Sequence, residues 1–244
     1  MHVVLLAAGL GMRLRPYTEV RPKCMMEVGG ITLLERHTRH LVRQGASRLT
    51  VVVGHLAEMI EVELARVKPA LPFNTLPNPV YTQGSILSLQ VGLERVADDL
   101  VFMDADVLYH PDVLGRLFRT QRASCLLVDA SATESGEEMM VGLKGGRAQV
   151  IARRVSHLGP FEHSGESVGF FRIAQAHLPL LKQAIEDTLS AEGDGAEYES
   201  ALNRFFHAVP VGAERVDDLA WTEIDFEEDL RRAREEIEPK LPGI

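Results

Sequence analysis

The stretch His2-Val-Val-Leu-Leu-Ala-Ala-Gly-Leu-Gly-Met-Arg13 decides the fold of this chain. The apolar run at its start is typical of a buried strand, and the two glycines that follow predict a tight turn. Glycines let the backbone approach a ligand closely, and backbone N–H groups can bind phosphate oxygens. Arg13 adds a cation with forked donors. An ordinary strand-to-helix turn with surface arginines would carry the same glycines, so the pair alone leaves both interpretations open.

The turn matches neither of the two common glycine-rich nucleotide motifs. No Gly-Lys-Ser/Thr follows at the spacing of a Walker loop, and Leu14 stands where a dinucleotide fingerprint has its third glycine. A dehydrogenase is therefore disfavoured.

Outward from this turn, apolar runs alternate with helical patterns as far as about residue 130. Thr32-x-x-Glu35 is a capping box, and Pro111 suits the first position of a helix. The alternation predicts an α/β fold with a doubly wound, mostly parallel sheet. The expected strands are 2–7, 49–53, 100–103 and 124–128, and the expected helices follow Thr32, cover 56–67, and begin near residues 85 and 111.

The second half has a different pattern. A hairpin is expected around Gly145-Gly146, with a strand at 167–173, helices at 175–190 and 197–207, and a final helix after Asp225. We expect one domain over 1–244, with a nucleotide-binding half at 1–130 and a smaller, partly antiparallel acceptor-binding half at 131–244.

The composition of the chain argues against several classes of function. The net charge of −9 over 244 residues argues against nucleic acid as a partner. No apolar run could cross a membrane and no signal peptide is recognisable, so a cytoplasmic location is expected. The two cysteines suggest no disulfide framework. The cations Arg13, Arg15, Arg21 and Lys23 gather in one loop, which suits either a small anion or a solvated surface.

The stretch Leu6 to Lys23 resembles the signature of the sugar-phosphate and alcohol-phosphate nucleotidyltransferases, L-A-A-G-x-G-x-R-L-x-P-x-T-x-x-x-P-K, at every specified position. The resemblance implies a Rossmann-like nucleotidyltransferase fold. It also implies that Ala8 and Gly9 lie against the base, and that Gly11, Arg13 and Lys23 hold the triphosphate. The implied nucleotide-binding residues of this stretch are Leu6, Ala7, Ala8, Gly9 and Gly11, and the implied catalytic cations are Arg13 and Lys23.

A second segment, Asn78-Pro-Val-Tyr81 followed by Gly84-Ser85 and Ser88, resembles the N-P-x-Y-x-x-T-N-N-x-x-S-L pattern of LicC-type phosphocholine cytidylyltransferases. Gln83-Gly84-Ser85 replaces T-N-N, which puts base selection in doubt. The resemblance implies that Asn78, Tyr81, Gly84, Ser85 and Ser88 bind the nucleotide. Ser85 is also a candidate helix N-cap, and Asn78 a candidate turn residue.

Carboxylates at two places suggest a metal site. Asp104 and Asp106 follow a buried strand and point the same way on an extended chain. The resemblance makes Asp106 catalytic and a metal ligand, with Asp104 in support at the nucleotide. Trp221-Thr-Glu223-Ile-Asp225 resembles the W-x-E-I-D segment of the same branch and implies Asp225 and Glu223 as further ligands. Asp225 could instead cap the final helix together with Glu228. Mg²⁺ is the expected cofactor, because it needs few protein ligands beside phosphate oxygens.

The acceptor should bind in the second half. Gly165-Glu166-Ser-Val-Gly169 resembles a G-E-x-x-G strand that lines this pocket in relatives, and Glu166 could meet a hydroxyl or an amine. Tyr198 and Trp221 could form an aromatic box for a quaternary ammonium, or both could be core residues.

We therefore expect a magnesium-dependent cytidylyltransferase. It would join CMP from CTP to phosphocholine, an aminoalkyl phosphonate, inositol phosphate or a similar acceptor, and release pyrophosphate. The alternatives are a sugar-1-phosphate nucleotidyltransferase using UTP, dTTP or GTP, and a non-catalytic nucleotide-binding regulator. A homodimer is compatible with the sequence.

Overall fold

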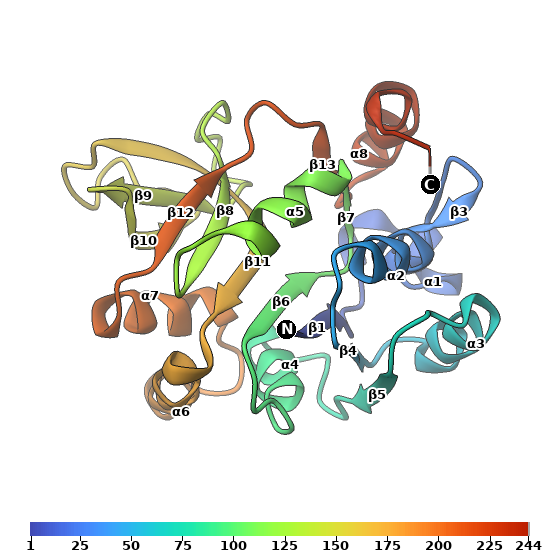
Figure 1. Cartoon of the computed structure of the whole chain (residues 1–244), viewed down its shortest axis with the longest axis horizontal. Coiled ribbons are helices and arrows are strands. Elements are labelled where there is room, and N and C mark those ends of the chain that lie inside the picture. Colours follow the sequence, from blue (N-terminus) through green and yellow to red (C-terminus); the bar gives the residue numbers. More distant parts are fainter. Residues whose placement is uncertain (244) are drawn as a thin grey trace.

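A nine-stranded sheet runs through the computed structural model, which describes residues 1–243 (Figure 1). Its strands lie in the order β5 (Phe73–Pro77), β4 (Arg48–Val53), β1 (His2–Ala7), β6 (Leu100–Asp104), β11 (His163–Ile173), β8 (Cys125–Asp129), β12 (Gly212–Arg215), β10 (Arg147–Ala152) and β9 (Met140–Lys144).

The sheet is mixed rather than mostly parallel in its pairings. β5, β4, β1 and β6 pair in parallel, as expected for alternating strands and helices. β11 then enters antiparallel between β6 and β8, and the β9–β10 hairpin extends the sheet beyond β12. The expected hairpin is confirmed. Since β11 comes from the second half of the chain and lies between strands of the first half, both halves share one sheet.

Helices cover both faces of the sheet, because its central strands are apolar on both sides. On β1, Val3 and Leu5 belong to one core cluster and Val4 to the other. The first cluster includes residues of α2 (Leu33–Arg43), α3 (Ala57–Val67) and α5 (Pro111–Arg119). The second includes residues of α4 (Ser85–Gly92), α6 (Leu178–Glu192) and α7 (Tyr198–Ala208).

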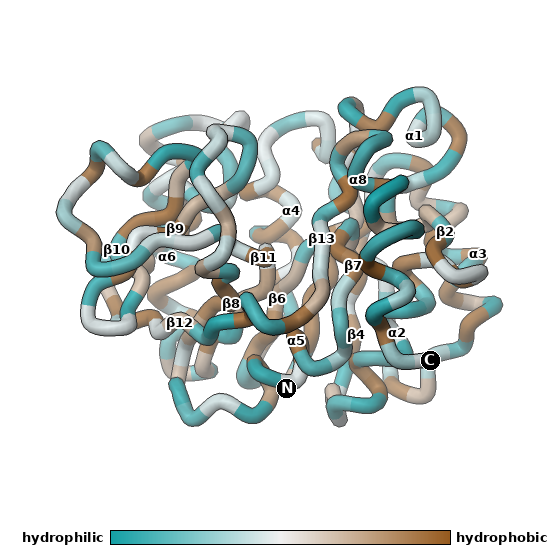
Figure 2. Tube along the Cα trace, turned by 90° about the horizontal axis from the view of Figure 1, so that it is seen from above, coloured by the Kyte–Doolittle hydropathy of each residue, from teal (hydrophilic) through white to brown (hydrophobic). Residues whose placement is uncertain are grey.

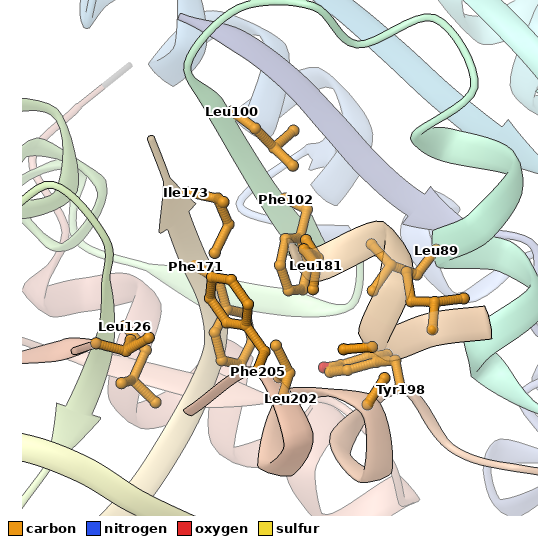
Figure 3. Packing of buried hydrophobic residues seen from close by; sticks show 14 of the residues in the cluster. Leu89, Leu100, Phe102, Leu126, Phe171, Ile173, Leu181, Tyr198, Leu202 and Phe205 are labelled. Carbon is orange, nitrogen blue, oxygen red and sulfur yellow. The ribbon is translucent and has the colours of Figure 1, made fainter. Parts of the chain in front are cut away.

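Aromatic packing joins the two halves where β6 meets β11. The rings of Phe102 and Phe171 stack with centroids 4.6 Å apart, and Tyr198 of α7 meets Phe102 edge-on at 5.8 Å (Figure 3). Figure 2 shows hydrophobic residues concentrated on the inner strands and hydrophilic residues on the outer turns.

Smaller elements surround the ends of β1 and β6. They are α1 (Tyr17–Val20), the pair β2 (Glu27–Val28) and β3 (Ile31–Thr32), the pair β7 (Val107–Tyr109) and β13 (Trp221–Glu223), and α8 (Glu227–Arg232), which continues into a π-helical stretch at Ala233–Ile237. In the described residues, none of the helices combines the length and the apolar character needed to cross a bilayer.

Within the nine-stranded sheet the sequence patterns missed two strands, and they misassigned one helix cap. β5 lies in a proline-rich stretch, but it is an edge strand, where proline is tolerated. β12 is only four residues long. Thr32 caps α2 as expected, accepting from the N–H of Glu35 at 3.0 Å. α4 begins at Ser85, but its N-cap is Gly84, so the prediction that Ser85 caps this helix is wrong.

Candidate active site

The glycine turn after β1 brings a lysine against it. Gly11 has φ +61°, and a Cβ atom there would lie 2.8 Å from Cγ2 of Thr18 and 2.9 Å from Cγ of Lys23. Both the backbone angle and the close packing therefore require glycine. The Thr18 hydroxyl donates to the Gly11 carbonyl at 2.7 Å and closes the loop. This loop carries Lys23 back beside the end of β1.

Lys23 lies between two of the expected metal ligands. Its Nζ donates to Oδ2 of Asp106 at 2.9 Å and also to Oδ1 of Asp225. Arg13 donates to the other oxygen of Asp225, and its guanidinium stacks over Phe226, 5.1 Å from the ring centre. Burial alone would lower the pKa of Lys23, but the two carboxylates together hold that pKa above its ordinary value. The implied catalytic cations thus contact the implied metal carboxylates directly.

Strand pairing brings the carboxylates together. β13 pairs antiparallel with β7, and the Ile224 N–H donates to the Asp106 carbonyl at 3.0 Å. As a result, carboxylate oxygens of Asp106, Glu223 and Asp225 all lie within 4.8 Å of one another. A set of hard carboxylate oxygens fits Mg²⁺, which prefers oxygen ligands.

The cap of α8 does not use Asp225. The Asp229 carboxylate accepts from the N–H groups of Asp225 at 3.0 Å and Phe226 at 2.8 Å. The alternative in which Asp225 caps the final helix with Glu228 is therefore wrong, and the Asp225 side chain faces Lys23 and Arg13 instead.

Asp104 lies beside this cluster and is held by Tyr198, whose hydroxyl donates to its Oδ2 at 2.6 Å. Burial and the neighbouring Asp106 raise the pKa of Asp104, while this hydrogen bond opposes the rise. Gly169 has φ +77°, and a side chain there would overlap the Asp104 carboxylate.

A cavity of about 420 Å³ opens between the glycine turn and the start of α4. Tyr81, Ser85 and Ser88 line it opposite the turn. It is lined by most of the residues that the sequence assigned to the nucleotide: Leu6, Ala7, Ala8, Gly9, Gly11, Arg13, Lys23, Tyr81, Ser85, Ser88, Asp104 and Asp106.

Two of the implied nucleotide-binding residues do not line this cavity. Asn78 is 2% exposed, and its amide donates to the Ser88 hydroxyl at 3.0 Å while its oxygen accepts from the Val80 N–H. Gly84 packs against the backbone at Ala196, where a Cβ atom would overlap the carbonyl oxygen. Both expectations of ligand contact are corrected: these residues shape the chain around Ser88 and Ser85.

A second cavity, of about 520 Å³, adjoins the first and shares Arg13, Glu137, Glu223 and Asp225 with it. Glu166 and Trp221, two of the residues expected to bind the acceptor, line this second cavity. Burial, followed by the carboxylates of Glu138 and Asp129, raises the pKa of Glu166 to about 7.

The expected aromatic box is wrong, because its two rings line different cavities. Tyr198 is 6% exposed and lines the first cavity, where its hydroxyl binds Asp104. Trp221 lines the second, and its Nε1 donates to Asp129 at 2.8 Å.

Several residues that line the site belong to none of the sequence motifs. Glu137 lies 3.6 Å from Arg13 at the shared wall, Arg153 and Glu199 line the first cavity, and the Glu197 carboxylate accepts from the Ser85 hydroxyl at 2.5 Å. For Glu197 and Glu199, the sequence offers one signal, two acidic residues that flank Tyr198 at the start of an expected helix.

A family model described as the MobA-like NTP transferase domain matches residues 3–191, and the chain belongs to this family. The resemblance to nucleotidyltransferases is thereby confirmed. Over 240 residues, the chain is 31% identical to the bifunctional IPC transferase and DIPP synthase of Rubrobacter xylanophilus, covering 96% of this chain and 51% of that protein. Over 246 residues, it is 27% identical to the CMP-5'-(3-aminopropyl)phosphonate synthase of Streptomyces rubellomurinus, covering 96% and 38%. The chain thus spans about half the length, or less, of these two relatives.

Solved structures share the fold. The inositol-1-phosphate CTP transferase from T. maritima superposes with a TM-score of 0.76 at 18% identity, over 97% of both chains. The CTP:phosphocholine cytidylyltransferase LicC of Streptococcus pneumoniae gives 0.74 at 21% identity, over 96% of this chain and 97% of that one. The expected Rossmann-like nucleotidyltransferase fold agrees with both.

Proposed function

We propose that this chain is a magnesium-dependent cytidylyltransferase, which transfers CMP from CTP to a small phosphorylated alcohol or phosphonate and releases pyrophosphate. The observation that carries the proposal is the group of two cations and three carboxylates that lies beside the wall shared by the two cavities. Of the two longer relatives named above, one is named as the synthase of a CMP-linked phosphonate and the other as an IPC transferase and DIPP synthase.

The two cavities suit two phosphorylated substrates. CTP would lie in the first, with its base near Ala8 and Gly9, and the acceptor in the second, near Glu166. Arg13 belongs to both cavities, and Lys23 lies in the first beside the shared Asp225. The reacting phosphates would therefore meet beside the two cations.

Transfer of CMP to the acceptor needs few protein side chains. The acceptor phosphate is already a nucleophile at neutral pH, so no general base is required. The residues orient it toward the α-phosphorus, and Arg13 and Lys23 neutralise charge on the leaving pyrophosphate. Asp106, Glu223 and Asp225 would hold Mg²⁺, which when bound neutralises phosphate charge and orients the triphosphate.

A second candidate is a sugar-1-phosphate nucleotidyltransferase. Over 122 residues, the chain is 34% identical to a UTP–glucose-1-phosphate uridylyltransferase of Haloferax volcanii, although this covers only 50% of the chain. The two candidates differ in the nucleotide and in the acceptor that they consume.

Pyrophosphate release with magnesium tests both. CTP, UTP, GTP, ATP and dTTP would each be combined with phosphocholine, 2-aminoethylphosphonate, inositol phosphate and hexose 1-phosphates, with Asp106→Asn as the control for contaminating activity. Release with CTP and an alcohol phosphate or phosphonate supports the proposal. Release only with UTP, dTTP or GTP and a hexose phosphate supports the second candidate. Nucleotide binding without release under any condition would contradict both and support a regulator.

A further inference from the structure

A third cavity, of about 340 Å³, lies where the end of α2 meets the end of α3. Among the described residues, it shares no lining residue with either cavity of the candidate active site. We call it the α2–α3 cavity. Its walls are mainly apolar, from Val42, Val67, Pro69, Ala70 and Pro111.

The charged side chains of the α2–α3 cavity all have one sign. Arg39, Arg43 and Lys68 line it, and no carboxylate does among the described residues. Arg39 is bound to Glu35 at 2.5 Å. Within the part of the chain that the structure describes, neither Arg43 nor Lys68 has a carboxylate oxygen within 4.0 Å. An apolar cavity edged by uncompensated cations is complementary to an organic anion.

Lys68 is also held in an unusual backbone conformation. It caps α3 with φ +47°, in the left-handed region where glycine or asparagine is usual. A lysine at such a position costs conformational energy, which is consistent with a role for its side chain at the cavity.

His40 supplies the strongest sign that something is to be bound here. It lines the α2–α3 cavity, is 3% exposed, and has no hydrogen-bond partner among residues 1–243 for either ring nitrogen. Burial, followed by the nearby His37, Arg36 and Arg43, lowers the pKa of His40 to about 3, so the ring is neutral. Buried polar atoms without partners are rare in native proteins and costly, and a ligand in the cavity would relieve that cost.

Buried contacts lead from His40 to the metal carboxylates. The His40 ring meets Tyr109 edge-on, with centroids 5.1 Å apart. The Tyr109 hydroxyl lies 3.2 Å from Nδ1 of His37, and Nε2 of His37 lies 3.1 Å from the Ala105 carbonyl oxygen. If Nε2 carries the proton, it donates to that carbonyl and Nδ1 accepts from Tyr109. Ala105 stands between Asp104 and Asp106, so this network supports the loop that bears the metal ligand.

We propose that the α2–α3 cavity is an effector site for a small organic anion with an apolar body, and that its occupancy changes metal affinity at Asp106 through His40, Tyr109 and His37. The coupling must be reciprocal: metal binding must change anion affinity by the same factor.

The probe is 8-anilinonaphthalene-1-sulfonate, an aromatic sulfonate whose fluorescence rises in apolar surroundings. It would be titrated into the full chain in the presence of saturating CTP, which on the proposed function occupies the active site. The expected result is that Arg43→Ala/Lys68→Ala raises the dissociation constant by about tenfold or more. Ala70→Trp, which fills the cavity, should weaken binding similarly, and Arg95→Ala, which removes an exposed arginine outside the cavity, should not. Equal affinity in all four proteins would overturn the site.

The coupling is measured with the same probe. Magnesium should change its dissociation constant about fivefold or more in the unsubstituted chain, and Tyr109→Phe should remove most of that change. No magnesium effect in the unsubstituted chain would overturn the coupling.

Light scattering tests whether this face instead binds a second copy of the chain. A dimer that becomes monomeric in Arg43→Ala/Lys68→Ala would assign this face to a second copy and overturn the proposal. Because binding is read by fluorescence, failure here is distinct from failure of the proposed transferase activity.

Discussion

Replacing Lys23 with methionine removes the ammonium that Asp106 and Asp225 share, at similar side-chain length. The side chains of all three residues are only 14–18% exposed, so solvent screens them weakly. Carboxylate oxygens of Asp106, Glu223 and Asp225 lie within 4.8 Å, and an effective dielectric constant near 20 gives about 3.5 kcal/mol of repulsion for one pair at that distance.

Two effects limit this cost. Arg13 still neutralises part of the Asp225 charge. In addition, desolvation and the carboxylates of Asp106 and Asp225 raise the pKa of Glu223, so this carboxyl can take up a proton at a lower cost than an isolated one and reduce the repulsion. We therefore expect Lys23→Met to lower the free energy of unfolding by about 2–3 kcal/mol without metal. For a chain of this size the melting temperature would fall by roughly 4–12 °C.

Magnesium should reverse part of this loss, because the ion restores positive charge among the three carboxylates. Differential scanning fluorimetry with and without 10 mM MgCl₂ (a chosen assay concentration) measures it, and the magnesium-induced rise should be larger in Lys23→Met than in the unsubstituted chain. Arg21→Met is the matched control. Its exposed pair with Glu27, at 3.3 Å, should change the melting temperature by no more than about 2 °C. Turnover of Lys23→Met should fall about 100- to 1,000-fold. An unchanged melting temperature and an unchanged response to magnesium would refute the reasoning.

Three further predictions concern other residues. Asp106→Asn should remove turnover while leaving the melting temperature without metal unchanged or higher, since it relieves repulsion rather than core packing; near-normal turnover with magnesium would contradict its role as a ligand. Since the pKa of Glu166 is about 7, this carboxyl is mostly neutral at pH 6 and mostly ionised at pH 8. The KM of an acceptor with a cationic amine should therefore fall about tenfold across that range, and steady-state kinetics should show no such fall in Glu166→Gln. Gly84→Ala should destabilise the fold by about 1–3 kcal/mol in urea unfolding, because its methyl group would overlap the Ala196 carbonyl oxygen. The neighbouring control Gly195→Ala should cost clearly less, since no atom of the described residues lies within 4 Å of the added carbon; equal costs would argue against close packing at residue 84.

The sequence predicted the elements whose signals are local. β1 has five consecutive apolar or small residues after a polar start, and α2 follows Thr32, whose capping partner Glu35 stands three residues later. β11 could be predicted as a strand, but not as the strand that separates β6 from β8, because its antiparallel position depends on pairings far along the chain. β12 has too few residues for a periodic pattern.

The site was predicted unevenly for a related reason. Residues expected to meet a ligand through the backbone of one loop, such as Gly9 and Gly11, follow from the loop's own sequence, and both line the first cavity. Asn78 and Gly84 occur within a recognised pattern, yet one binds Ser88 and the other fits against Ala196, contacts that a motif cannot distinguish from ligand contacts. Likewise, the two aromatic residues expected to form one box line separate cavities, because Tyr198 belongs to α7 and Trp221 to β13.

Asp225 shows how tertiary structure decides between two local interpretations. An aspartate just before a helix is a natural cap, and its sequence position permitted that role. Asp229 satisfies the N–H groups of Asp225 and Phe226 from inside the first turn, so the Asp225 side chain is not needed there. The β7–β13 pairing and the Ile224–Asp106 hydrogen bond then fix its backbone beside Asp106. Two carboxylates held this close repel each other, and Lys23 and Arg13 offset the repulsion. The glycine turn and the distant C-terminal segment therefore depend on each other, because the first supplies the cations without which the second would hold uncompensated negative charge.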